Sequence, residues 1–151
     1  MTLKGLVARV PQMVLGFALG YAGIGHLTTS RVEFRAQVPS VFADYADFVV
    51  LASGVVEIAL GVGLIFVWKY RVQIGWLVAA FFVAIFWGNI SQYVNGVDAF
   101  GLDTDTKRLV RLFFQPVMVA WGLLSTGAWS ARRSKRSSQL DIDLEEDTIY
   151  G

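Results

Sequence analysis

One carboxylate, Glu57, lies in the middle of an apolar run, Phe48–Trp68, that is long enough to cross a lipid bilayer. A titratable group at that depth is costly, so it requires a polar partner and commonly has a function. Strongly polar side chains also lie near one end of the other apolar segments: His26, Asn89, Gln115 and Arg111. An acid, an imidazole, amides and a guanidinium can together exchange a proton and hydrogen-bond a small ligand. These five residues are therefore the candidate ligand-binding site.

The composition restricts the chemistry that the chain can perform. Its 151 residues are 55% hydrophobic and 17% charged, which is too apolar for the surface of a soluble domain of this size. The net charge is +1 and the basic residues are dispersed, so nothing indicates nucleic-acid binding. The absence of cysteine excludes disulfides, thiolate catalysis and iron–sulfur clusters. With a single histidine as well, we expect no metal site and no catalytic residue.

Four apolar segments have about the length that a membrane helix needs, at about residues 10–28, 48–68, 72–94 and 109–129. The second and third are joined only by Lys69, Tyr70 and Arg71, which forces an antiparallel helix hairpin. Pro116 should kink the fourth segment or delay its start. The pattern predicts an all-α fold, a four-helix transmembrane bundle over residues 1–129.

Basic residues near the ends of the segments predict the orientation of the bundle. One side has Lys4, Arg9, Lys69, Arg71 and four basic residues at 132–136, more than the other side. By the positive-inside rule, both termini are then cytoplasmic in a multi-pass protein of a bacterial inner or plasma membrane. Residues 130–151 are first basic and serine-rich and then acidic, so we expect a mobile cytoplasmic tail.

This topology places the candidate residues at a similar depth. Glu57 is nine residues into its helix, roughly 13 Å at 1.5 Å per residue. It shares one helix face with Ser53, Gly54 and Gly61, and small residues of this kind mark a face that packs closely on another helix. We therefore expect Glu57 to face the protein interior and not the lipid.

The sequence leaves the partner and the purpose of Glu57 open. The carboxyl is either protonated and bonded to Asn89 or Gln115, or ionised and paired with Arg111 or a protonated His26. The cluster is either a polar clasp that fixes the register of the helices or a small pocket for a ligand such as a quinone head group. Taken singly, Arg111 is an interfacial anchor, and Gln115 satisfies a carbonyl freed by Pro116.

Several short motifs resemble those of one membrane-protein family: Gly23-Ile24-Gly25-His26-Leu27, Gln37-Val38-Pro39, Ser53-Gly54-Val55-Val56-Glu57-Ile58 with Gly61, Tyr70-Arg71, Phe86-Trp87-Gly88-Asn89-Ile90, and Gln115-Pro116 with Trp121. In order and spacing, over about residues 9–126, they are similar to the DoxX and DoxX-like proteins. One departure is Gly88, where a proline commonly precedes the asparagine in similar proteins. The resemblance implies a four-helix membrane bundle associated with quinone-linked respiratory or redox enzymes.

The resulting expectation is an accessory subunit of a quinone-linked redox or respiratory membrane complex, at most a non-catalytic or quinone-binding part of an oxidoreductase. It would have no intrinsic cofactor, with a quinone as the candidate ligand of Glu57, His26, Asn89, Gln115 and Arg111. Its partners would be the lipid bilayer, other membrane or redox subunits and a second copy of the chain. The alternative is a structural anchor or assembly factor with no ligand site.

Overall fold

The computed structural model describes the backbone of residues 9–150 and the side chains of residues 9–140. Lys4, which contributed to the predicted orientation, lies outside the described residues. The described chain is entirely helical and contains no strand, which confirms the predicted fold class. Its α-helices are α2 Val10–Leu27, α3 Arg31–Ala36, α4 Ala46–Phe66, α5 Arg71–Val94, α6 Asp105–Ser125 and α7 Ala128–Tyr150, with short 3-10 helices η1 Ser40–Tyr45 and η2 Trp68–Tyr70.

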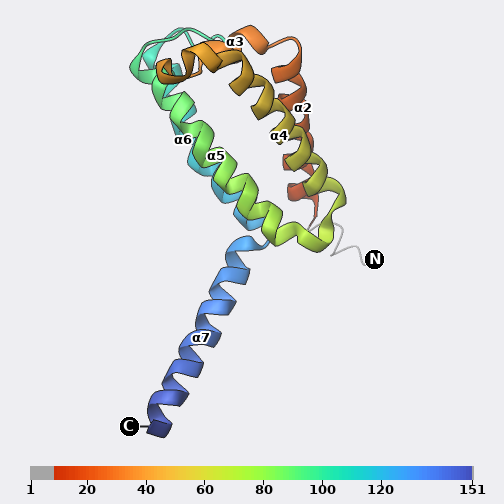
Figure 1. Cartoon of the computed structure of the whole chain (residues 1–151), viewed down its shortest axis with the longest axis vertical. Coiled ribbons are helices and arrows are strands. Elements are labelled where there is room, and N and C mark those ends of the chain that lie inside the picture. The colour runs from red at the N-terminus through yellow and green to blue at the C-terminus, as the bar shows by residue number, and fades with distance from the viewer. Residues whose placement is uncertain (1–8, 151) are drawn as a thin grey trace.

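The long helices form two antiparallel pairs, α2 with α4 and α5 with α6, and contacts between the pairs are sparse (Figure 1). Glycines allow the first pair to approach backbone to backbone. A Cβ atom added to Gly23 would lie 2.6 Å from the carbonyl oxygen of Gly54, and one added to Gly61 would lie 2.6 Å from that of Gly16. Only glycine fits such contacts, which are typical of close helix packing in membranes.

The packed apolar core fills the half of the molecule that contains η2, the turn between α4 and α5. Its fully or nearly fully buried members come from three helices: Leu15, Leu19, Leu64, Val78 and Phe82. The indole of Trp121 in α6 donates to the carbonyl oxygen of Pro11 in α2 at 3.0 Å, which joins the two pairs in this half. The polar residues of interest lie in the other half.

By length and composition, two segments can cross a membrane: η1 with α4, and η2 with α5. A third is added if α6 and the first part of α7, bent by 66° at residues 126–127, count as one broken span. Helix α2 is not among these candidate spans. The structure thus supports two or three spans where the sequence predicted four.

The C-terminal region differs from the expected mobile tail. Residues Ala128–Tyr150 form one helix, α7, which projects away from the other helices (Figure 1). The segment has no glycine or proline, and its arginine, glutamate and leucine residues favour helix even without a core to pack on. The side chains from residue 141 onward, including the acidic end, lie outside the described residues.

Candidate functional site

Two of the five candidate residues, His26 and Glu57, form a buried acid–base pair between α2 and α4. The Nδ1 atom of His26 lies 2.7 Å from Oε2 of Glu57, and the residues are only 6% and 4% exposed. The glycine contact just below positions them, because a Cβ atom on Gly54 would lie 2.7 Å from Cβ of His26. Of the partners considered for Glu57, the structure therefore selects His26.

The relative orientation of the two side chains leaves Nδ1 of His26 and Oε2 of Glu57 without a hydrogen bond in the described part of the chain. Although the two atoms are close, neither has a partner with hydrogen-bond geometry among the described residues. Buried polar atoms are nearly always satisfied, and exceptions concentrate at functional sites or at sites of bound water and ions. His26 also packs against the ring of Phe34 in α3. The imidazole is thus held on one side by an aromatic ring and on the other by a carboxylate.

The other three candidate residues form a separate network on α5 and α6. Nδ2 of Asn89 donates to Oε1 of Gln115 at 2.9 Å, and Nε of Arg111 donates to Oδ1 of Asn89 at 3.2 Å. The amide of Gln115 donates to the carbonyl oxygen of Phe82 at 2.6 Å. Gln115 therefore bonds to the neighbouring helix, whereas the sequence had suggested a carbonyl freed by Pro116. These bonds fix which face of each amide is presented to its surroundings.

Two further residues extend the network, and the predicted site omitted both. Nη2 of Arg111 donates to Oε1 of Gln37 at 3.3 Å, and Nε2 of Gln37 donates to Oε1 of Gln92 at 2.8 Å. Gln37 is buried although it lies in the connection between α3 and η1. Arg111 is thus a member of a buried network and not only an interfacial anchor. The sequence signal was Gln37-Val38-Pro39, which had been used only as a family motif.

Arg111 has no carboxylate within ion-pair distance among the described side chains. Its guanidinium instead lies 5.3 Å from the centre of the Phe100 ring, which also packs on Phe34 at 4.6 Å. Phe100 has a φ of 54°, an uncommon left-handed conformation for an aromatic residue. Such a conformation requires support from the surrounding structure and is frequent at functional sites.

Both polar groups face one cavity of about 610 Å³ between the two helix pairs. All five predicted residues line it. Among the described residues, no hydrogen bond or ion pair joins the His26–Glu57 pair to the network of Asn89, Gln115 and Arg111. The remaining wall is largely apolar and aromatic: Phe34, Val38, Pro39, Phe42, Val49, Val50, Phe81, Ile85 and Trp87. This volume lies within the range of small-molecule sites, whose walls are typically apolar with a few convergent polar groups.

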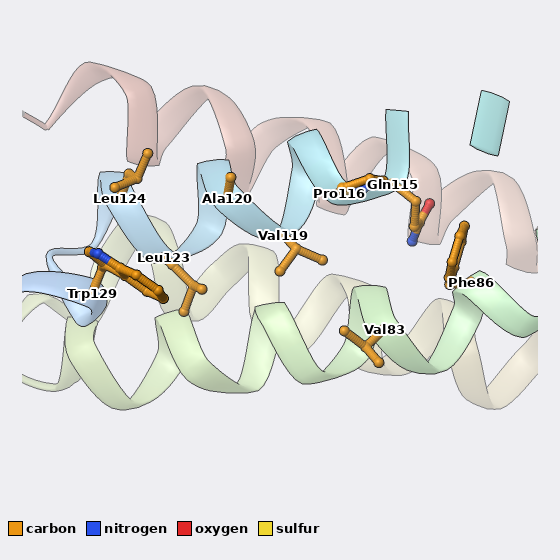
Figure 2. A pocket seen from close by; sticks show the side chains of 9 residues that line it. All are labelled: Val83, Phe86, Gln115, Pro116, Val119, Ala120, Leu123, Leu124 and Trp129. Carbon is orange, nitrogen blue, oxygen red and sulfur yellow. The ribbon is translucent and has the colours of Figure 1, made fainter. Parts of the chain in front are cut away.

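A second hollow, a groove of about 490 Å³ between α5 and α6, has a different chemistry (Figure 2). It is lined by Val83, Phe86, Gln115, Pro116, Val119, Ala120, Leu123, Leu124 and Trp129. Its one amide, that of Gln115, is already bonded to Asn89 and Phe82. The groove therefore presents a largely apolar surface suited to acyl chains.

Comparison with family models assigns the chain to a protein family. Residues 15–126 match the family described as Domain of unknown function (DUF8561). The chain belongs to this family. The DUF8561 match covers most of α2 and all of α4, α5 and α6, and thus every helix that carries one of the five candidate residues. No curated protein and no solved structure matches the chain.

The resemblance to DoxX proteins is wrong, because the only family match is to DUF8561 and none is to DoxX. Several of the motifs that suggested it are small residues around a histidine, a glutamate and an asparagine. In this DUF8561 protein, Gly23, Gly54 and Gly61 serve the backbone contacts of α2 with α4. Any close-packed pair of membrane helices requires such residues, so they do not specify a family.

Proposed function

We propose that this protein is a multi-pass protein of a cell membrane, with α2, α4, α5 and α6 as a four-helix membrane bundle and both termini cytoplasmic. The apolar lengths of α4 and α5 support the embedding. Exposed Lys69 and Arg71 lie at the end that contains η2, as do Arg132 and Arg133 of α7. At the other end, cations such as Arg31, Lys107 and Arg108 are paired with aspartates. The positive-inside rule counts lysines and arginines, and it favours the cytoplasm for the η2 end, which has more of them.

We further propose that the central cavity binds a small membrane-soluble molecule with a carbonyl-type polar head, such as a quinone or quinol. The carrying observation is that an acid–base pair and a network of donors face each other across one largely apolar cavity. The ring of the ligand would pack among Phe81, Trp87 and the neighbouring apolar side chains. The protein would then be an accessory subunit of a redox or respiratory membrane assembly, with electrons supplied by a partner.

Each polar group has a role in this proposal. The guanidinium of Arg111 and the amide of Asn89 donate hydrogen bonds to the carbonyl oxygens of the ligand. Glu57 and His26 lie close enough to share a proton and exchange it with a quinol hydroxyl. In this proposal electrons come from a partner, and the chain's own residues bind and orient the ligand and exchange protons.

Matched substitutions in the cavity and the groove test this proposal. Ala84 lines the cavity and Ala120 lines the groove, and both are exposed in the unliganded protein. Binding of a short-chain quinone is followed by quenching of Trp87, with Trp87→Phe as the blank. Ala84→Phe should weaken binding by about tenfold or more, about 1.4 kcal/mol, whereas Ala120→Phe should leave it unchanged. Equal effects of the two variants would reject the cavity as the site.

A structural anchor without a ligand is the second candidate, and the hydrogen-bonded amides favour it. The bonds of Asn89, Gln115 and Arg111 hold α5 on α6, as a register clasp would. Gln37, in the connection between α2 and α4, extends this network toward the first helix pair, yet no bond among the described residues joins the network to the His26–Glu57 pair. If the protein binds no quinone and Glu57→Gln leaves its association with partner proteins intact, the anchor is the better account.

A further inference from the structure

The end of the molecule that contains η2 carries a concentrated positive charge framed by aromatic rings. The guanidinium of Arg9 lies 4.3 Å from the centre of a Trp68 ring, and that of Arg132 lies 5.7 Å from Trp76. Lys69 and Arg71 are exposed between them, and residues 133–136 add three more exposed basic side chains on α7. Tryptophan and basic side chains together are typical of the membrane–water interface.

The carboxylates whose side chains are described lie far from these cations. The described carboxylates other than Glu57 lie at the opposite end of the molecule, on α3, η1, the start of α4 and residues 98–105. The ion pairs observed outside the cavity are also there, such as those of Arg31 with Asp47 and of Lys107 with Asp103. The η2 end therefore presents a net positive surface to whatever lies against it.

The turn before α7 sets the direction of that helix. Gly127 adopts a φ of +73°, which favours glycine, and the hydroxyl of Thr126 donates to the carbonyl oxygen of Gly122 at 2.7 Å. Thr126 and Ala128 are fully buried, and both lie against Gly75 of α5, so α7 is anchored at its start. Helix α7 consequently leaves α6 at an angle of 66°.

That angle places α7 close to the membrane surface. If α6 runs along the bilayer normal, the axis of α7 lies about 24° from the membrane plane, the complement of 66°. Each residue then advances about 0.6 Å away from the bilayer, given a rise of 1.5 Å. Residues 132–136 lie only about 2–5 Å beyond the turn, within a headgroup layer about 5–8 Å thick. The acidic stretch from residue 141 to 147 lies about 8–12 Å beyond the turn, at or beyond the edge of that layer.

We propose that α7 is an interfacial helix whose basic first half binds the headgroups of anionic phospholipids, with its acidic second half held outside the headgroup layer. The proposal rests on the membrane embedding proposed above, but not on a cavity ligand. Each basic residue should raise the ratio of lipid-bound to unbound α7 by up to about fivefold at low salt. The attraction should fade in 1 M salt, where the Debye length is only about 3 Å.

The absence of cysteine makes a site-specific test direct. A single Ser134→Cys variant, labelled with a polarity-sensitive fluorophore, is placed as the full chain in nanodiscs of phosphatidylcholine or of phosphatidylcholine with phosphatidylglycerol. The label should shift to the blue only with the anionic lipid, and 1 M salt should reverse the shift. The same label at Ser40→Cys, at the opposite end, should not respond. Adding Arg132→Gln and Arg133→Gln should lower the bound ratio by up to about 25-fold.

Each other outcome overturns the proposal in a distinguishable way. The same shift in pure phosphatidylcholine would show an apolar partition instead of headgroup binding. A shift that grows with protein density and not with anionic lipid would indicate that α7 pairs with a second copy of the chain. Failure to enter nanodiscs of either composition would refute the membrane embedding itself. Loss of quinone quenching with an intact lipid response would refute only the cavity ligand.

Discussion

The close contact between α2 and α4 gives a sharp prediction, because a glycine with no space and a glycine with free space lie one turn apart on α2. A Cβ atom at Gly23 would lie 2.6 Å from the carbonyl oxygen of Gly54 and 2.8 Å from Cγ1 of Ile58. A Cβ atom at Gly20 would meet nothing within 4 Å. Gly23→Ala should therefore push α2 away from α4, and Gly20→Ala should not.

The comparison isolates the packing cost. Both substitutions gain a similar helix propensity, up to about 1 kcal/mol, so this contribution cancels when the two variants are compared. What remains is the cost of overpacking at Gly23, about 1–3 kcal/mol. The added Cβ atom would clash with the backbone of Gly54, which cannot move away by a change of rotamer. Gly23→Ala should thus be less stable than Gly20→Ala by about that amount. It should also separate His26 from Glu57, since the contact of Gly23 with Gly54 positions that pair.

Unfolding in mixed micelles with increasing denaturing detergent, followed by circular dichroism, measures this difference. Quinone quenching of Trp87, measured on the same preparations, reports whether the cavity changes as well. Equal stability of the Gly23→Ala and Gly20→Ala variants would refute the backbone contact between α2 and α4. A destabilised Gly23→Ala variant with unchanged binding would show that the contact does not position the site.

Three further predictions concern the other end of the molecule and the network. Buried Arg108 bonds to two carbonyl oxygens and two aspartates within residues 95–105. Arg108→Gln should therefore increase amide hydrogen exchange across these residues and lower the free energy of unfolding by about 1–3 kcal/mol. Unchanged exchange would contradict this prediction. The hydrogen bond from Lys107 lowers the pKa of Asp103 below its ordinary value of 3.8. The pair therefore stabilises the folded protein fully above pH 3.8, and this stabilisation is lost as the pH falls through the lowered pKa. The thermal midpoint of Asp103→Asn should therefore approach that of the unsubstituted chain at about pH 2, and a constant gap would refute the pair. Gln115→Leu should cost about 0.6–2 kcal/mol in detergent unfolding through its lost bonds to α5, and an unchanged midpoint would show that the network does not hold α5 on α6.

Much of the architecture follows from the apolar pattern. The expected segment 48–68 is helix Ala46–Phe66, and 72–94 is helix Arg71–Val94, because long apolar runs leave the backbone no other way to satisfy its polar groups in a membrane. Glu57 with its small neighbours indicated a buried, closely packed face. The structure places it there, against His26.

Other features depend on contacts that a linear pattern does not encode. The connection at residues 28–46 has no long apolar run, yet it folds into α3 and η1 and buries Gln37 in the network. The separation of the polar residues into two groups across a cavity depends on how far apart the two helix pairs sit. Helix α7 was read as a tail because it has no apolar face, although its helix-forming residues were visible. The family was misassigned because a series of short motifs, several of them built on packing glycines, was taken as its signature.

We propose that the cavity between the two helix pairs holds a membrane-soluble quinone or quinol against Glu57. The most direct measurement is solvent extraction of the gently solubilised, purified protein, with the extracted quinones quantified against protein. We predict near-stoichiometric quinone in the unsubstituted chain and in the matched surface control Glu33→Gln, and its loss in folded Glu57→Gln. A folded protein that carries no quinone, or a Glu57→Gln variant that retains it fully, would contradict the account.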